Sequence, residues 1–140
     1  MNLIDNKRCF VCGKENESGL KIDFFIENRR IRAEFSIDNR FQGFSGIVHG
    51  GIISTILDEA MVKLAFGLGF SAVTANLNVN LRKPAKPNEK LIATGEIIGD
   101  FGRKIKAKSS ITKEDGALVA EAEGLLVKCQ KFPPTETNVS

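Results

Sequence analysis

The stretch HGGIISTILDE brings together groups that could act on a carbonyl compound. His49, the only histidine of the chain, is followed by Gly50 and Gly51, and two adjacent carboxylates, Asp58 and Glu59, end the stretch. The first backbone N–H groups of a helix have no internal partner and carry partial positive charge, and glycine lets a ligand approach them closely. A helix that begins at Gly50 could therefore stabilise an oxyanion, while a carboxylate further along serves as a base.

The apolar residues of this stretch predict one long helix, from Gly50 to about Phe66. They recur at helical spacing and form a single stripe for burial. The sequence GLGF then ends the helix. The stripe consists of Ile53, Ile56, Leu57, Ala60 and Leu64.

Asp58 and Glu59 lie on opposite flanks of the stripe, so periodicity alone does not choose between them. Glu59 has Lys63 four residues later, which is the arrangement of a solvated ion pair on a helix. Asp58 has Ser54 four residues earlier and no cation at helical spacing. We therefore interpret Asp58 as the functional carboxylate. The competing interpretation is a partly buried aspartate that bonds Ser54.

Alternating apolar and polar residues predict strands on both sides of the helix. The segment after the helix, SAVTANLNVNLRKP, places Thr74 and Asn76 on the face opposite to its valines and leucines. The predicted strands lie within 20–37 (two strands about the turn ENRR), 71–84, 90–102, 103–116 and 117–132.

These elements predict an α+β fold in which a curved antiparallel sheet wraps around one long central helix. Residues 1–18 are expected to form an irregular leader, 19–132 a single domain and 133–140 a flexible tail. One helix cannot cover the whole sheet, so we expect a homo-oligomer, either a dimer or a dimer of dimers.

The composition excludes several classes of protein. The chain has 140 residues, 42% of them apolar, and a net charge of +3, which does not suggest a nucleic-acid binder. It has no apolar run long enough for a membrane span and no signal core, so we expect a cytoplasmic protein. Cys9 and Cys12 have the spacing of a zinc or redox pair, but a zinc site needs about four ligands. We interpret the pair as reduced thiols and predict neither a metal nor a cofactor.

Three motifs in this order resemble those of the hotdog-fold thioesterases, with the closest likeness to the PaaI-type acyl-CoA thioesterases. The motifs are GIVHGG followed by Asp58, then TANLNVNLRKP, then Gly102-Arg103-Lys104. The resemblance covers roughly residues 9 to 130 and implies the hotdog fold and an acyl-CoA substrate.

The resemblance also implies roles for single residues. The N–H of Gly50 would hold the oxyanion, and His49 would orient the loop or the thioester. Asp58 would act as nucleophile or as general base for water, and the hydroxyl of Thr74 would hold the water or the carboxylate. In some relatives an Asn or Gln in the loop before HGG supports the thioester, and Gln42 lies in this loop. Gly51 and Asn76 are further candidates for substrate binding.

Cations in two segments could grip the phosphates of coenzyme A. Arg82 and Lys83 lie beside the prolines of KPAKP, and Arg103 and Lys104 begin a strand after a glycine turn. These assignments complete the prediction of an acyl-CoA thioesterase.

Two other functions compete with it. A hotdog protein could bind acyl-CoA without turning it over, although such a sensor would not need a carboxylate at the catalytic position. A hydratase would need a histidine and an acid poised across a C–C bond, whereas His49 at a helix start is better suited to polarising a carbonyl.

Overall fold

The computed structural model describes residues 3–129, and the predicted tail at 133–140 lies outside them. None of the helices in this part of the chain has the combined length and hydrophobicity of a membrane span. The elements are β1 (Phe25–Glu27), β2 (Arg30–Phe35), the 3-10 helix η1 (Asn39–Phe41), α1 (Gly50–Gly67), β3 (Ala72–Leu81), β4 (Leu91–Phe101), β5 (Lys104–Lys113) and β6 (Leu118–Lys128).

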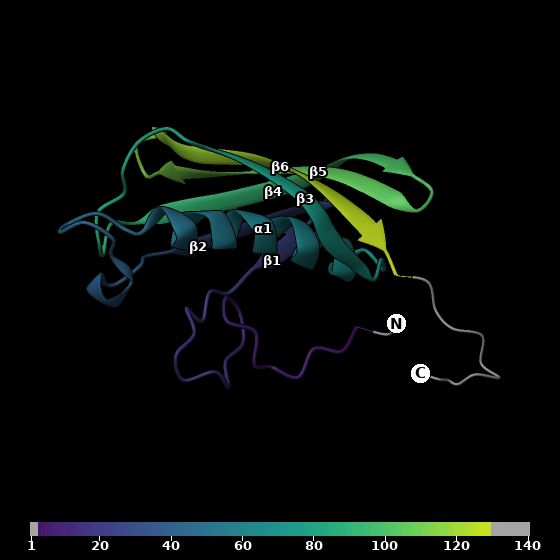
Figure 1. The fold of residues 1–140 in the computed structure, drawn as a ribbon, viewed down its shortest axis with the longest axis horizontal. Helices are drawn as coiled ribbons and strands as arrows, with labels where there is room; N and C mark the ends of the chain where they lie inside the picture. Colours follow the sequence, from purple (N-terminus) through teal and green to yellow (C-terminus); the bar gives the residue numbers. More distant parts are fainter. Residues whose placement is uncertain (1–2, 130–140) are drawn as a thin grey trace.

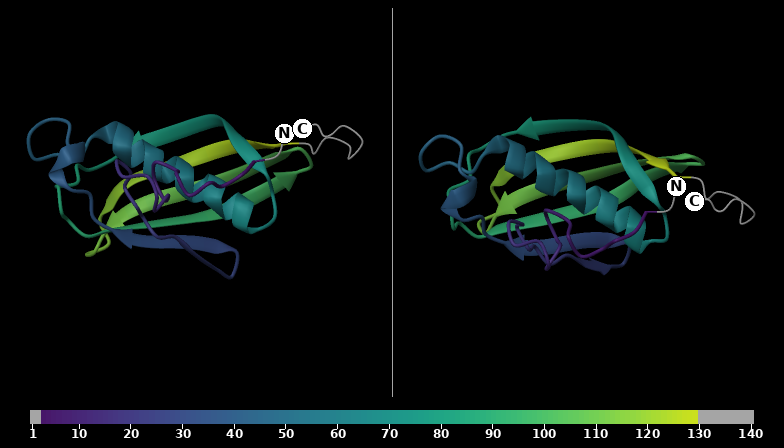
Figure 2. Two further views of the ribbon diagram at one scale, coloured as in Figure 1. Left: turned by 90° about the horizontal axis from the view of Figure 1, so that it is seen from below. Right: turned by 60° about the horizontal axis from the view of Figure 1, so that its bottom comes forward.

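The strands form one antiparallel sheet in the order β1-β2-β4-β5-β6-β3. The sheet curves over α1, which lies against one of its faces (Figure 1). Figure 2 shows α1 crossing the strands obliquely. The predicted hotdog arrangement of one central helix and a curved sheet is therefore confirmed.

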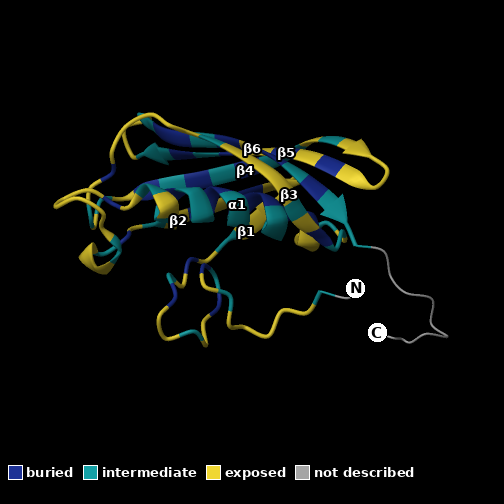
Figure 3. Cartoon of the chain, in the orientation of Figure 1, coloured by how far each residue is buried: buried dark blue, intermediate teal, exposed yellow. Residues whose placement is uncertain are grey.

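The core lies between α1 and the sheet, where the buried residues gather in Figure 3. Every apolar position of the predicted helix stripe is buried, and Met61 and Ala65 extend it. One glycine on β6 allows the helix to approach closely, because a Cβ at Gly124 would lie 2.9 Å from Cε of Met61. On β4, a Cβ at Gly95 would instead crowd the neighbouring strand β2, at 3.0 Å from Cγ2 of Ile31.

Strand β3 differs from the simple alternation that its sequence predicts. Thr74 pairs with Leu126 and Asn76 pairs with Leu125, so one extra residue forms a bulge between them. A bulge moves the following side chains to the other face of a strand. Thr74 therefore faces the helix, on the same side as Val79, and the prediction that it lies on the opposite face is wrong.

The first predicted strand begins later than its sequence suggests. Residues 20–24 lie outside the sheet, and the N–H groups of Leu20 and Ile22 donate to the carbonyls of Phe10 and Val11 in the leader. Ile22 and Val11 are 3% and 2% exposed, so the leader contributes to the core. In Figures 1 and 2 the leader lies against α1 on the side away from the sheet.

Candidate active site

The start of α1 is held by His49, whose ring caps the helix. Nδ1 of His49 accepts a hydrogen bond of 2.8 Å from the N–H of Gly51. The N–H of His49 itself donates to the carbonyl of Phe41 at 2.9 Å, which ties the cap to the preceding loop. Among residues 3–129, the N–H of Gly50 has no hydrogen-bond partner. One backbone donor at the positive end of the helix is thus available to a ligand.

The two glycines after His49 leave room for its ring and for the side chain of Leu81. A Cβ at Gly51 would lie 3.0 Å from Nδ1 of His49 and crowd the capping ring. A Cβ at Gly50 would lie 2.9 Å from Cδ1 of Leu81, at the end of β3. The helix start therefore packs tightly against the edge strand while its free N–H stays accessible.

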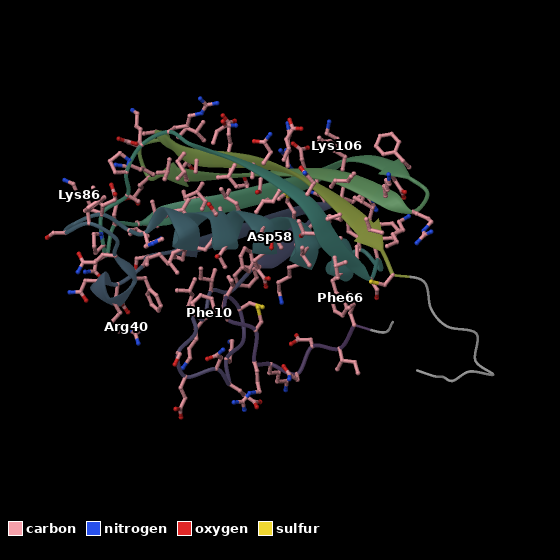
Figure 4. The ribbon with its side chains drawn as sticks, viewed as in Figure 1. Phe10, Arg40, Asp58, Phe66, Lys86 and Lys106 are labelled. Atoms are coloured by element: carbon pink, nitrogen blue, oxygen red, sulfur yellow. The ribbon has the colours of Figure 1, made fainter. Side chains whose placement is uncertain are left out.

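Asp58 lies two turns further along α1 and is half-buried (Figure 4). Its Oδ1 accepts a hydrogen bond of 2.6 Å from the hydroxyl of Thr74. This is the short distance of a charge-assisted O–H···O⁻ bond. Within the described residues, no cation pairs with Asp58, and Ser54 instead donates to the carbonyl of Gly50 at 2.9 Å. The interpretation of Asp58 as a partner of Ser54 is therefore wrong.

The bulge in β3 is what brings Thr74 to Asp58. Without the extra residue, the side chain of Thr74 would point away from the helix. With it, a hydroxyl donor is fixed against one carboxylate oxygen, and no described side chain bonds the other oxygen. Such a carboxylate is oriented and can still accept a proton or attack an electrophile.

Ser109 holds the middle of the helix and was not predicted as a site residue. It is a buried polar residue of β5, 5% exposed, and its hydroxyl donates to the carbonyl of Leu57 at 2.8 Å. Leu57 directly precedes Asp58, so this bond fixes the backbone that carries the carboxylate. Only tertiary packing places Ser109 there, because 52 residues separate it from Leu57.

Two other predicted site residues, Gln42 and Asn76, lie in different parts of the molecule. Gln42 accepts a hydrogen bond from the N–H of Gly46 at 2.9 Å and lines a hollow of 340 Å³ with His49 and Gly51. Asn76, beyond the bulge, lies on the face of β3 opposite to Thr74 and is exposed. The structure thus brings Gln42 close to the helix start but does not bring Asn76 to Asp58.

Arg40 also lines this hollow, although the sequence did not single it out. Its guanidinium forms an exposed ion pair of 2.9 Å with Asp38, and these hydrogen bonds lower the pKa of the Asp38 carboxyl. It also lies 5.1 Å from the ring centroid of Phe41. Arg40 lies in the one-turn helix η1, which Asp38 caps, and this pattern carries no functional signal in the sequence.

The predicted phosphate-binding cations lie at opposite ends of the folded molecule. The segment with Arg82 and Lys83 lies at the start of α1, where the N–H of Val48 donates to the carbonyl of Ala85 at 2.9 Å. Arg40 and Lys86 are both at this end in Figure 4.

Arg103 lies at the other end of the molecule. Its carbonyl accepts a hydrogen bond from the N–H of Lys128, and Lys128 pairs with Ala72 where β3 begins. Lys104 follows Arg103 as the first residue of β5. Arg82 is in addition paired with Glu121 at 2.7 Å. A single chain therefore does not bring the two basic groups together.

Glu59 does not form the surface pair predicted with Lys63. It accepts a hydrogen bond of 3.3 Å from the thiol of Cys9, while Nζ of Lys63 lies 3.4 Å from Sγ of Cys12. No ion pair joins Glu59 to Lys63 in the described part of the chain. The leader packs over this flank of α1 and places its two cysteines between the charged groups.

Strand β3 is an edge of the sheet and is ten residues long, whereas β1 at the other edge has three. Several of its apolar side chains are exposed, among them Val73, Leu77 and Leu81. A long edge strand presents unpaired backbone groups and is a template for pairing with another strand.

Comparison with known proteins identifies the family of the chain. Residues 45–120 match the family model of the thioesterase superfamily. Acyl-coenzyme A thioesterase THEM4 of Rattus norvegicus is 30% identical over 123 residues, which are 84% of this chain and 53% of the relative. The chain spans about half the length of the curated relatives it matches.

Solved structures share the fold. The crystal structure of a thioesterase superfamily protein is 28% identical, with a TM-score of 0.82, over 86% of this chain and 60% of that one. A hypothetical thioesterase from Streptococcus pneumoniae, crystallised with coenzyme A, is 19% identical, with a TM-score of 0.74, over 80% of this chain and 88% of that one.

Proposed function

The chain belongs to the thioesterase superfamily, and from this premise we propose that it hydrolyses the thioester of an acyl-coenzyme A to the free acid and coenzyme A. The observation that carries the proposal is the half-buried Asp58 carboxylate, which Thr74 orients at 2.6 Å and no described cation neutralises. The family match includes His49, Gly50 and both of these residues. A curated relative named as an acyl-coenzyme A thioesterase supports the substrate class, and we place the chain in the PaaI-like branch.

In the proposed reaction Asp58 acts as general base or as nucleophile. As base, it takes a proton from water while the water oxygen attacks the thioester carbon. The tetrahedral oxyanion accepts a hydrogen bond from the N–H of Gly50, a contribution of about 3 kcal/mol per donor in well-studied enzymes. The C–S bond then breaks, and the leaving thiolate takes the proton back from Asp58. This chemical step uses no cofactor.

His49 assists from the helix cap. Because its Nδ1 accepts the N–H of Gly51, a neutral ring carries its proton on Nε2. That N–H can donate to the thioester carbonyl beside Gly50. Thr74 has the complementary role of fixing Asp58 or its water. In the Streptococcus pneumoniae protein, alanine variants have been crystallised at an aspartate and at a threonine sixteen positions further along, which is the spacing of Asp58 and Thr74.

The spacing along α1 supports the proposal that two chains share each site. Gly50 and Asp58 are eight residues apart, which is about 12 Å of helix rise. One thioester carbonyl cannot lie within about 3 Å of both groups. A second copy that pairs along the exposed edge strand β3, related by a two-fold axis, would set the helices antiparallel. Asp58 of one chain would then face Gly50 of the other, in a dimer or a dimer of dimers.

The same arrangement gives a role to the separated cations. Arg82 and Lys83 lie at the helix start of one chain, and the partner's turn with Arg103 and Lys104 would come toward them. Together they would bind the phosphates of coenzyme A by charge-assisted hydrogen bonds. Gln42 and Gly51, which line the hollow at the helix start, are the further substrate contacts of the proposal, whereas the position of Asn76 does not support a contact. We propose a cytoplasmic location for the protein.

A panel of acyl-CoA substrates with detection of the free thiol tests the function. The expected result is turnover of at least one acyl class, inhibited by coenzyme A. Tight binding of acyl-CoA without release of thiol would contradict hydrolysis and favour a binding protein.

Mixing two inactive variants tests the shared site. Asp58→Asn and Gly50→Pro chains, each inactive alone, should restore about a quarter of the parent turnover after subunit exchange, because half of the dimers are mixed and each has one intact site. No recovery in mixtures that contain mixed dimers by native mass spectrometry would contradict the shared site.

A further inference from the structure

The side of α1 opposite Thr74 carries a cluster that the proposed reaction does not use. Cys9 and Cys12 of the leader and Glu59 of the helix place two sulfurs and a carboxylate oxygen within 4.8 Å of one another. All three residues are half-buried. Fifty residues separate Glu59 from Cys9, so the cluster is a product of the fold.

We propose that Cys9, Cys12 and Glu59 form a site for a thiophilic divalent metal, zinc in the first place, which fastens the leader to α1. Zinc binds thiolate sulfur at about 2.3 Å and carboxylate oxygen at about 2.0–2.2 Å, so tetrahedral ligands lie roughly 3.5–3.8 Å apart. Sγ of Cys9 and Oε2 of Glu59 are 3.3 Å apart. The donor atoms therefore need to move by little more than rotamer adjustments to hold the ion.

The backbone around the cysteines forms a compact turn that presents both sulfurs on one side. The N–H of Gly13 donates to the carbonyl of Cys9 at 2.8 Å, and the N–H of Val11 donates to Sγ of Cys9 at 3.4 Å. A Cβ at Gly13 would lie 2.3 Å from the backbone nitrogen of Cys9, so only glycine allows this turn to close. Backbone N–H donors to sulfur are partners that orient a ligand and tune its metal affinity.

The charges of the cluster favour a divalent cation. Two thiolates and a carboxylate carry three negative charges, and Lys63, 3.4 Å from Sγ of Cys12, supplies one positive charge. A divalent ion brings the sum to zero. Because the thiol of Cys9 donates a hydrogen bond to Glu59 in the structure, metal binding would displace protons from the thiols, as it does at other cysteine sites.

The three ligands leave one coordination position for a small exogenous ligand. All of them line a surface hollow of 390 Å³ that Phe66 also borders. Structural zinc sites usually have four protein ligands, while sites with three keep a water or another small ligand in the fourth position. The proposed ion would therefore be held by the protein and remain open to exchangeable ligands from the hollow.

Metal analysis of the full chain, prepared with a phosphine reductant and dialysed against zinc, tests the site. We expect about one zinc per chain, and with Co²⁺ a sulfur-to-metal charge-transfer absorption in the near ultraviolet. Cys9→Ser and Cys12→Ser should each lose this absorption. Glu59→Gln should keep both thiolates but bind zinc at least about tenfold more weakly, because one of three ligands loses its charge.

Cys129→Ser is the matched control, because Cys129 is a half-buried cysteine at the end of the sheet and lies outside the cluster. It should bind zinc like the parent. Less than about a tenth of an equivalent of zinc in the reduced parent would overturn the proposal, since a built site should fill. Equal zinc in the parent and in Cys9→Ser would also overturn it, because the metal would then lie elsewhere. A melting temperature that zinc raises in the parent and not in Cys12→Ser would support it independently of the absorption.

Discussion

Asp58 and Glu59 are neighbours in the sequence, but their carboxylates face opposite flanks of α1. Consecutive residues of a helix are about 100° apart around its axis. Asp58 therefore points to the edge strand, where Thr74 donates a bond of 2.6 Å. Glu59 points to the leader, where Cys9 donates a bond of 3.3 Å. The element packed on each flank, and not the helix itself, determines what each carboxylate can do.

The two environments differ in the strength of their hydrogen bonds. A hydroxyl donor to a carboxylate gives a strong, directed bond, whereas a thiol is a weak donor. Asp58 is thus oriented and uncompensated in charge, as a base or nucleophile must be. Glu59 accepts a weak hydrogen bond from the thiol of Cys9, and Lys63 contacts Cys12 instead, so a metal ion would satisfy the Glu59 carboxylate better. In this account α1 carries the reactive carboxylate, Asp58, on one side and a proposed metal ligand, Glu59, on the other.

Removal of the backbone N–H of Gly50, the proposed oxyanion donor, should cause the largest loss of turnover among the changes around Asp58. Gly50→Pro deletes the N–H, and proline suits this first helical position because His49 already has the extended backbone (φ −58°, ψ 131°) that a preceding residue needs. We expect kcat to fall by about 10²–10³.

Gly50→Ala is its control, since it adds the same Cβ beside Leu81 and keeps the N–H. It should lose much less turnover in the same free-thiol assay. Equal losses in the two variants would show that packing at Leu81, and not the N–H, matters at this position.

Thr74→Val tests whether the hydrogen bond to Asp58, which Glu59 lacks, contributes to turnover. Valine keeps the shape of the side chain and removes the donor to Asp58. A hydrogen bond to a charged group contributes about 1.5–3 kcal/mol, so kcat should fall by about tenfold to a hundredfold. Thr74→Ser keeps the hydroxyl and should retain most of the turnover. If Thr74→Val turns over like the parent, the bond to Asp58 has no part in the reaction.

Ser109→Ala should have the smallest effect, because Ser109 acts through the backbone of Leu57. Loss of its buried bond should lower the free energy of unfolding by about 1 kcal/mol, measured by urea denaturation. Turnover should change by only a small factor. Ser110→Ala, which removes a partner of Thr94 on the other face of β5, is the comparison variant. A larger loss of stability in Ser110→Ala would contradict the anchoring role of Ser109.

Much of the side of α1 that carries Asp58 could be predicted from the local sequence pattern. The apolar spacing after Gly50 defines the helix and its buried side, and the lack of a cation near Asp58 in the sequence distinguishes it from Glu59. The position of Thr74 needed the family resemblance, because strict alternation places it on the wrong face. A bulge depends on how β3 pairs with β6, and a single strand's sequence does not contain that pairing.

The leader flank could not be predicted in the same way. The pair of Glu59 with Lys63 follows from helix spacing, but it assumes that nothing covers the helix. In the structure the leader does, with Val11 in the core and Cys9 beside Glu59. Contacts between segments fifty residues apart have no local signal, and so the third donor beside the two cysteines was missed.

The most direct test of the central claim compares kcat of Asp58→Asn and Glu59→Gln in one acyl-CoA hydrolysis assay, with circular dichroism to verify folding. Asparagine keeps the size and the contact with Thr74 but removes the charge. We expect Asp58→Asn to lose about a hundredfold or more in kcat, the scale of general-base loss, with acyl-CoA binding retained. Glu59→Gln should keep the greater part of its turnover. Near-normal hydrolysis by Asp58→Asn, or a greater loss in Glu59→Gln, would contradict the assignment of the reaction to Asp58.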